Sequence, residues 1–221
     1  MIELAPGVHA LAGFPRYAIS MYLIDGVLID AATRHSLGRI LREIKGRKLL
    51  AHALTHAHPD HQGASHALCE RLGLPLWCGA ADADAMARGA TRELIPANPV
   101  ALLVGALFAG PGHPVSRRLA EGDPVGSFEA IETPGHTPGH VAFWRARDRV
   151  LIIGDALANH PGGLPIGAKL SEPPTVFTVD VAQNRRSLRK LRDLNPALVA
   201  FGHGPPLRDP GAFREFIDRL A

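Results

Sequence analysis

The sequence of 221 residues has few of the features that mark exported, membrane-spanning or nucleic-acid-binding proteins. Its two cysteines, Cys69 and Cys78, are too few for a disulfide framework and lack the spacing of a metal site, so we expect both to be buried thiols. The longest apolar run, residues 100–109, has about half the roughly 20 residues that a membrane span needs. The net charge is only +3, with no block of five or more basic residues, and no nucleic-acid partner is implied.

The start of the chain also lacks a targeting signal. Residues 1–6 have neither the basic beginning nor the apolar run of a signal peptide, which predicts a cytoplasmic protein. Hydrophobic residues make up 46% of the chain and charged residues 20%, a balance typical of a folded domain. A chain of this length can bury about 70–75% of its unfolded surface in one core. We therefore expect a single domain over residues 1–221 that acts on a small molecule, without nucleic-acid or membrane partners.

What the sequence does contain is a dense group of metal-binding side chains at residues 55–61, which read Thr-His-Ala-His-Pro-Asp-His. The apolar run 49–54 before them predicts a short buried strand. A polar turn with solvated histidines is the alternative, but no packing requirement explains three histidines and an aspartate within seven positions. The pattern therefore favours a metal site at the end of a strand.

The local geometry supports this interpretation. His56 and His58 are two residues apart in an extended segment, so their side chains point the same way. Pro59 suits the first position of a helix, and Asp60 and His61 then fall in the first turn of that helix. One turn would present both groups of side chains to a common point outside the carboxyl end of a strand, where open α/β sheets tend to place their chemistry.

Taken in order, the hydrophobic pattern predicts two halves, each built of strands and helices. This indicates an internal αβ/βα duplication in architecture, although no sequence repeat is visible. The predicted strands are 8–11, 18–24, 27–29, 49–54, 75–77, 128–132, 141–144, 149–153 and 197–201, and the predicted helices are 36–44, 59–72, 80–87, 180–194 and 211–220.

Two segments do not follow this pattern. Residues 88–118 contain four prolines around the stretch 100–108, which is apolar on every side. Such a helix belongs in the core, covers the site as a lid, or forms an oligomer contact that would make a homodimer, and the sequence leaves these interpretations open. Residues 155–178 are rich in glycine and proline and are predicted to form a loop over the site.

Three more strand-to-loop corners each supply one further residue of the ligand type. His136, Asp155 and His203 all lie at strand exits among glycines or prolines, which allow the backbone to approach an ion closely. His52, His66, His113 and His160 lie outside this pattern and are interpreted as ordinary histidines, although His113 and His160 belong to loops that are candidates to overhang the site. The candidate ligands divide into two groups that Asp155 can bridge: His56, His58 and His136, and Asp60, His61 and His203.

This order of residues resembles the metallo-β-lactamase-fold hydrolases, a superfamily of the α/β (α+β) class built as a four-layer αβ/βα sandwich. The resemblance runs from the opening strands and Asp30 to the residues 201–204, Phe-Gly-His-Gly. It implies two divalent metal ions per chain, with Zn²⁺ expected and Mn²⁺ or Fe as alternatives. The implied ligands of the first ion are His56, His58 and His136, those of the second are Asp60, His61 and His203, and Asp155 would bridge the two.

The resemblance also implies a mechanism. A hydroxide bridging the two ions would attack the substrate, and Asp60 would act as the catalytic residue that places this hydroxide or passes a proton to the leaving group. Asp30 and Thr55 would either orient the outer nitrogens of the histidines or cap nearby backbone. His140 is expected to have a structural role.

Departures from the subfamilies narrow the expected reaction. Asp155 and the missing signal peptide argue against β-lactam hydrolysis, since the lactam-cleaving members have a cysteine or no bridging aspartate there. Residues 133–140 resemble the matching motif of glyoxalase II enzymes. However, the basic glutathione-binding stretch of those enzymes is absent from this sequence, and Gly63 differs from the residue that usually ends their first metal-binding motif. Acyl-homoserine lactonases use a tyrosine for which Tyr17 and Tyr22 are no clear match.

Two enzyme hypotheses result from these comparisons of motifs. The first is a metal-dependent hydrolase with two ions that cleaves an ester, thioester or lactone, with an apolar acyl group against residues 100–108. The alternative is an iron-dependent persulfide dioxygenase, which resembles this sequence in its fold and first motif but uses a single ion. Retention of Asp60, His61 and His203 favours the hydrolase. A metal-stabilised binding protein is less consistent with a complete ligand set.

Overall fold

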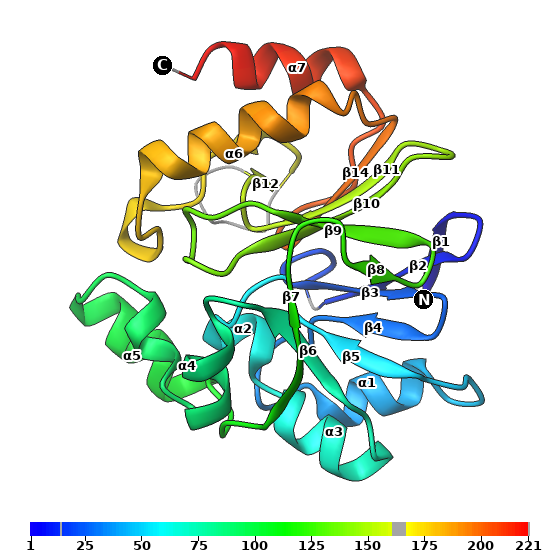
Figure 1. Cartoon of the computed structure of the whole chain (residues 1–221), viewed down its shortest axis with the longest axis vertical. Helices are drawn as coiled ribbons and strands as arrows, with labels where there is room; N and C mark the ends of the chain where they lie inside the picture. Colours follow the sequence, from blue (N-terminus) through cyan, green and yellow to red (C-terminus); the bar gives the residue numbers. More distant parts are fainter. Residues whose placement is uncertain (14, 161–166, 221) are drawn as a thin grey trace.

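The fold consists of two β-sheets packed face to face between outer layers of helices (Figure 1). The computed structural model describes residues 1–13, 15–160 and 167–220. The seven strands of the first sheet follow chain order, and β4 to β7 are mutually parallel. They are β1 (Ile2–Ala5), β2 (Val8–Ala12), β3 (Ser20–Ile24), β4 (Val27–Ile29), β5 (Ala51–Ala53), β6 (Leu76–Gly79) and β7 (Val115–Leu119).

The second sheet is formed by the later part of the chain. Its strand order is β14-β11-β10-β9-β8, with β14 parallel to β11 and the other pairs antiparallel. A small separate pair, β12 with β13, lies in the loop after β11. The bounds are β8 (Pro124–Val125), β9 (Phe128–Glu132), β10 (Val141–Arg145), β11 (Val150–Gly154), β12 (Ala158–Asn159), β13 (Leu170–Ser171) and β14 (Leu198–Phe201).

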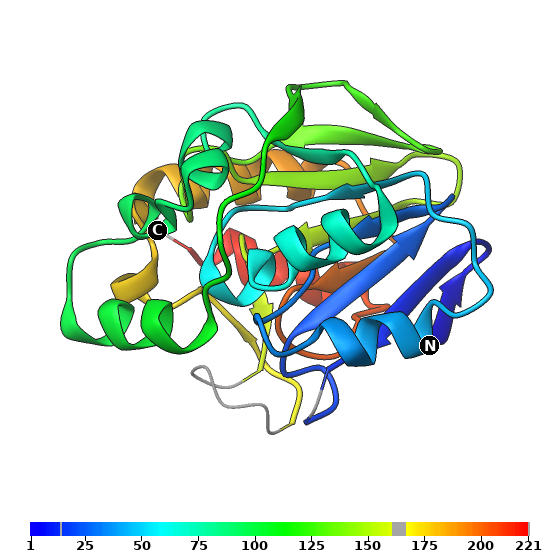
Figure 2. The ribbon, with the colours of Figure 1, turned by 90° about the horizontal axis from the view of Figure 1, so that it is seen from below.

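Helices cover the outer face of each sheet, as Figures 1 and 2 show. Three apolar clusters result, one between the sheets and one beneath each helical layer. Strands β3, β10 and β11 are buried along their whole length because both of their faces are covered. The helices on the first sheet are α1 (Leu37–Glu43), α2 (Pro59–Gln62), α3 (Ser65–Leu72) and α4 (Ala83–Arg88). The helices on the second sheet are α6 (Val181–Asp193) and α7 (Pro210–Asp218). The helix α5 (Pro99–Phe108) and the 3₁₀ helices η1 (Thr91–Leu94) and η3 (Thr175–Phe177) lie towards one side of the molecule.

The four-layer αβ/βα architecture expected from the sequence is confirmed. The predicted strands differ from the observed ones mainly at their ends, but five observed strands were not predicted: β1, β7, β8, β12 and β13. Asp180 is the N-cap of α6, where its side chain accepts a hydrogen bond of 2.8 Å from the Gln183 backbone N–H. Cys69 and Cys78 are buried free thiols, as expected. No helix among the described residues has the length and apolar character needed to cross a membrane.

The prediction of a single helix over 59–72 is wrong. The structure has two helices there, α2 and α3, and the helix is interrupted at Gly63. A Cβ atom at Gly63 would lie 2.3 Å from the backbone nitrogen of Arg34 and 2.5 Å from the carbonyl oxygen of Phe108. The Gly63 N–H also donates to the carbonyl oxygen of Ala32 at 2.8 Å. The backbone of two distant segments therefore occupies the space that a continuous helix and its side chains would need.

Residues 88–118 contain several elements, and their action as a lid stays a prediction. Their last part is the edge strand β7 of the first sheet, and the core-helix interpretation of residues 100–108 is wrong. In α5 only Ala101 and Gly105 are buried, whereas its large apolar side chains are among the most exposed of the described chain. Those exposed by about half are Val100, Leu102, Leu103 and Leu107.

His52 in β5 makes the stability of the fold sensitive to acid. Its Nδ1 donates to the Leu28 carbonyl at 2.9 Å, its Nε2 accepts from the Ser65 hydroxyl at 2.8 Å, and burial lowers its pKa to about 4. The unfolded chain binds this proton near pH 6.5, so stability should fall as the pH drops through 6.5 and level off near 4, by about 3 kcal/mol from this group. Urea unfolding of the wild type and His52→Asn at several pH values measures this, and equal pH dependence in the two proteins would contradict it.

Candidate metal centre

The site lies where strands of both sheets end. Strands β4 and β5 of the first sheet are parallel, as are β11 and β14 of the second, so their carboxyl ends share an edge in each sheet. The chain places Asp30 after β4, His56 and His58 after β5, Asp155 after β11 and His203 after β14. This is the position at which parallel sheets usually place binding and catalytic groups.

The first group of three histidines is almost completely buried. The rings of His56 and His58 lie 4.6 Å apart between centroids, and the ring of His136 lies 4.8 Å from His56 and 4.5 Å from His58. The Nε2 of His58 is 3.1 Å from the carbonyl oxygen of Leu94, which leaves Nδ1 free for a ligand. The Nδ1 of His136 lies 3.2 Å from the Thr178 hydroxyl, which leaves its Nε2 facing the other two rings.

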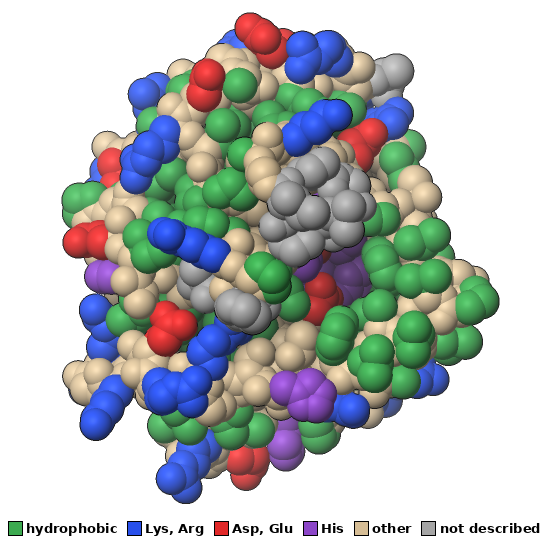
Figure 3. All heavy atoms as spheres, turned by 180° about the vertical axis from the view of Figure 1, so that it is seen from behind, with side chains coloured by type: hydrophobic (Ala, Val, Ile, Leu, Met, Phe, Trp, Pro, Cys, Tyr) green, Lys and Arg blue, Asp and Glu red, His purple; other side chains and the backbone are tan. Residues whose placement is uncertain are grey.

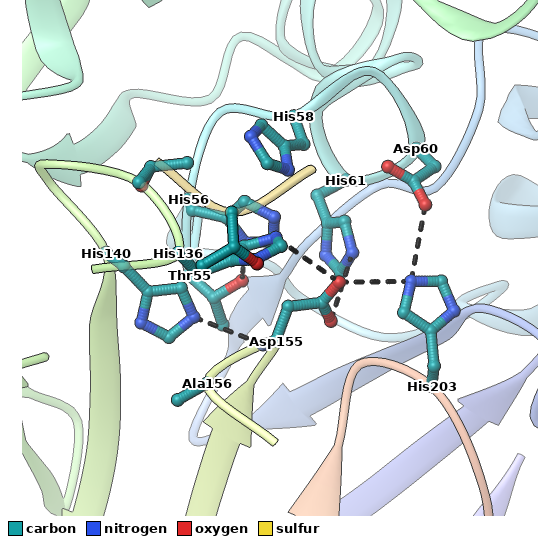
Figure 4. Close-up of polar contacts among 12 residues, drawn as sticks. Thr55, His56, His58, Asp60, His61, His136, His140, Asp155, Ala156 and His203 are labelled. Atoms are coloured by element: carbon teal, nitrogen blue, oxygen red, sulfur yellow. Dashed lines mark hydrogen bonds and ion pairs between the residues drawn. The ribbon is translucent and has the colours of Figure 1, made fainter. Parts of the chain in front are cut away.

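The second group gathers around Asp155 (Figure 4). The Nε2 of His61 is 3.4 Å from Oδ1 of Asp155, and the Nε2 of His203 is 3.2 Å from Oδ2 of the same carboxylate. Oδ2 of Asp60 lies 3.3 Å from the same Nε2 of His203. His136 also reaches Asp155, at 3.7 Å, so this carboxylate contacts both groups.

These residues form three overlapping sets of side chains whose ligand atoms lie within 4.8 Å of one another. Four of the buried ligand-type atoms have no hydrogen-bond partner within the described chain, although burial of such atoms is costly. Imidazole and carboxylate groups with free, converging lone pairs suit a divalent transition metal. The unpartnered atoms are Nε2 of His56, His61 and His136 and Oδ1 of Asp155, and the three sets are His56, His58 and His136; His56, His61 and Asp155; and Asp60, His61 and His203.

The two groups differ in protonation. Burial, reinforced by neighbouring imidazoles, holds the pKa of His56 and His136 well below the ordinary value, so both are neutral and able to bind a metal. Burial alone would also lower the pKa of His203, but the carboxylates of Asp155 and Asp60 raise it to about 10. Asp155 and Asp30 likewise raise the pKa of His61 well above its usual range. A metal ion entering the second group would therefore have to displace protons.

Asp30 and Thr55 form a buried network behind the site. The Asp30 carboxylate accepts from the backbone N–H and the hydroxyl of Thr55, both at 2.8 Å, and from Nδ1 of His61 at 2.9 Å. The Thr55 hydroxyl also lies 3.0 Å from Nδ1 of His56. Of the two roles considered from the sequence, the contacts agree with orientation of the histidines, because they leave Nε2 of His61 and His56 pointing into the site.

Asp82 and His140 hold the two motif loops, and the role of Asp82 was missed in the sequence. Asp82 accepts from the backbone N–H of Ala57 at 3.1 Å, from the Thr137 hydroxyl at 2.7 Å and from the Gly139 N–H at 2.7 Å. His140 accepts from the Asp155 backbone N–H at 3.1 Å, in line with the structural role expected for it. Asp82 follows the parallel strand β6, and this position after a strand was the one feature of the sequence that could have indicated its role.

A pocket opens above these residues, and an apolar wall faces the acidic and imidazole groups across it. Figure 3 shows histidine and acidic side chains in a hollow with hydrophobic side chains gathered beside it. Val104 and Phe108 of α5 contribute to the apolar side, so the part of α5 that faces the site acts as a wall of the pocket. His160 also lines the pocket, whereas His113 does not. The remaining lining residues are His58, Pro59, Asp60, Ile95, His136, Asp155, Pro174, Phe177 and His203.

The family of the chain follows from its comparison with known proteins. The family model described as the metallo-beta-lactamase superfamily matches residues 15–203, which include every candidate ligand. The chain belongs to the metallo-β-lactamase superfamily. It is 31% identical to the probable metallo-hydrolase YflN of Bacillus subtilis over 249 residues, covering 99% of this chain and 91% of that protein. It is also 30% identical over 156 residues to hydroxyacylglutathione hydrolase GloC of Haemophilus influenzae, covering 68% of this chain and 66% of that protein.

Solved structures of metallo-β-lactamase proteins agree with the fold. TTHA1623, solved in a di-iron-bound form, is 30% identical, with a TM-score of 0.68 over 88% of this chain and 91% of that chain. The subclass B3 enzyme BJP-1 of Bradyrhizobium japonicum has a TM-score of 0.70 at 23% identity, with coverage of 99% and 89%, and supports the fold alone. The family and these relatives support a metal-dependent hydrolase with a His/Asp cluster suited to metal binding.

Proposed function

We propose that this protein is a hydrolase with two divalent metal ions, most suitably Zn²⁺, that cleaves an ester, thioester or lactone bond. One observation carries the proposal: two groups of buried ligand-type atoms meet at Asp155, and four of these atoms have no hydrogen-bond partner among the described residues. One ion would be held by His56, His58 and His136, and the other by Asp60, His61 and His203, with Asp155 between them. When bound, such ions would lower the pKa of a water molecule and polarise a carbonyl group.

The chain's own residues would do the remaining work. Asp60 lines the pocket and has one carboxylate oxygen, Oδ2, against His203. Its other oxygen is available to take a proton from the attacking water. It would pass this proton to the departing oxygen or sulfur as the bond between that atom and the carbonyl carbon breaks. Asp30 and Thr55 would keep His61 and His56 in the orientation that this arrangement requires.

The pocket indicates the class of substrate. Its apolar side includes Val104, Phe108 and Phe177, and no lysine or arginine is among the lining residues that the structure describes. Such a surface suits a neutral acyl group better than a polyanionic one. The names of the hydroxyacylglutathione hydrolases among the relatives support thioester chemistry as one option, although the basic glutathione-binding stretch of those enzymes was not found in the sequence.

A single-iron persulfide dioxygenase is the second candidate, and the di-iron form of TTHA1623 keeps iron in consideration. The presence of Asp60, His61 and His203 as a complete second group favours two ions. Because a dioxygenase consumes O₂ whereas a hydrolase consumes only water, the two reactions leave different products.

Metal analysis of the purified protein, followed by an activity panel, tests the proposal. We expect about two zinc ions per chain and turnover of short and medium acyl esters, thioesters or lactones, with higher kcat/KM for the more apolar acyl groups. About one iron per chain, with oxygen uptake on a persulfide and no ester cleavage, would replace the hydrolase with the dioxygenase. The variant Val104→Asp is a control for the apolar wall, because it should reduce kcat/KM for apolar acyl groups without changing metal content.

A further inference from the structure

A second group of metal-type side chains lies outside the pocket. His66 and Glu70 are one helical turn apart on α3, so they share one face of that helix. His113, from the segment between α5 and β7, lies against them with its ring 5.4 Å from the ring of His66 between centroids. The three ligand atoms lie within 4.8 Å of one another, and no residue of this group belongs to the clusters around Asp155.

Two of the three distances within this group, those to His113, match a tetrahedral ion, and the pair His66 and Glu70 lies within 4.8 Å. The Nδ1 atoms of His66 and His113 are 3.4 Å apart, and Oε1 of Glu70 is 3.6 Å from Nδ1 of His113. Two Zn–N bonds of about 2.0–2.1 Å at a tetrahedral angle place the nitrogens roughly 3.3–3.4 Å apart. Burial and the neighbouring His66 lower the pKa of His113, so this imidazole is neutral at pH 7 and its lone pair is available.

The two backbone segments that carry His66 and His113 are held against each other. Gly110 packs against Gly63, where a Cβ on Gly110 would lie 2.0 Å from the Gly63 carbonyl oxygen. Three residues further along each segment, His113 faces His66. The His113 N–H donates to the Met86 carbonyl at 3.3 Å, which fixes this part of the chain to the end of α4. The two histidines therefore approach each other from anchored segments.

We propose that His66, Glu70 and His113 form a peripheral zinc site, with water as the fourth ligand, that fastens the segment 109–114 to α3. Because this segment directly follows α5, the ion holds the C-terminal end of α5 and its Phe108 against the pocket. The site is distinct from the one around Asp155 and has a structural effect that does not depend on the reaction catalysed.

Equilibrium zinc binding to the full-length protein tests this site. Protein that retains the two ions proposed for the site around Asp155 is titrated with Zn²⁺ against a chromophoric chelator, for the wild type, His66→Ala and Glu70→Gln, so that the peripheral ion is counted as a third. We expect the wild type to bind one more ion per chain than His66→Ala, and Glu70→Gln to bind that ion more weakly. Because Glu70 is 65% exposed, its replacement leaves the fold intact. His9→Ala, which removes a partly buried histidine of β2, is the matched control and should bind as the wild type does.

Two further readouts decide the structural effect. Zinc at about a hundredfold excess over its Kd should raise the Tm of the wild type by about 5–10 °C more than that of His66→Ala. It should also slow amide hydrogen exchange in residues 99–108 of the wild type but not of His66→Ala. Equal zinc content in the wild type and His66→Ala would overturn the site, and unchanged exchange in α5 would overturn the fastening of this helix.

Discussion

Replacing Asp60 with alanine is expected to lower kcat/KM by at least about a hundredfold, and to lower the metal content from about two ions per chain to about one. The carboxylate lines the pocket and contacts the side chain of His203, and among the described residues no backbone group depends on it. The fold should therefore persist while the second metal group loses one of its three side chains. Steady-state kinetics and metal analysis of the purified variant, with circular dichroism for the fold, measure the three outcomes.

Asp84→Ala is the matched control for this experiment. Asp84 is an exposed carboxylate on α4 that pairs with Arg118, so its replacement removes the same atoms away from the pocket. Metal content and kcat/KM should stay at the wild-type level in this variant. Full activity in Asp60→Ala would exclude the two-ion mechanism, because a complete second group would then be unnecessary for turnover.

Replacing Asp30 with alanine is expected to lower the free energy of unfolding by about 3–5 kcal/mol. The side chain is 1% exposed and accepts three hydrogen bonds, two from Thr55 and one from Nδ1 of His61. Alanine leaves these three buried donors without an acceptor, and it also has to adopt the φ of 59° that Asp30 has. Urea unfolding of protein treated with a chelator measures the loss without a contribution from bound metal.

Asp30→Asn separates the backbone effect from the loss of the carboxylate. Asparagine tolerates a positive φ and still offers one oxygen to Thr55, but its NH₂ group would face the N–H of His61. We expect this variant to lose less stability than Asp30→Ala but to bind metal at His61 more weakly. A loss below about 1 kcal/mol in Asp30→Ala would contradict the importance of this network.

The candidate ligands could be predicted from the sequence because their chemistry and their positions agree. His56, His58, Asp60 and His61 lie within one short motif, and the other three candidates each follow a strand that the apolar pattern predicts. Strand ends of parallel sheets converge in space, so residues that are distant in the chain could be expected to meet. Their roles as metal ligands stay a prediction that the metal analysis described above would test.

Other features depend on contacts that a sequence pattern does not contain. The break at Gly63 exists because the backbone of Arg34 and Phe108 occupies the adjacent space. The apolar run of α5 has no polar face, so its pattern is the same for a core helix and for a wall with exposed leucines. Asp82 is a single aspartate at the start of a helix, a position at which capping is the usual expectation, yet its side chain binds the two motif loops instead.

The attachment of α5 beside the site is made largely by main-chain atoms. The Arg34 N–H donates to the Phe108 carbonyl at 2.9 Å, and Gly110 lies directly on Gly63. Such contacts are insensitive to the side chains that α5 presents to the pocket. The side chains of Val104 and Phe108 can therefore change in size and polarity while the helix stays in place. Substrate preference can diverge through these positions without any change in the residues that carry out the chemistry, so α5 is the place to redesign selectivity first.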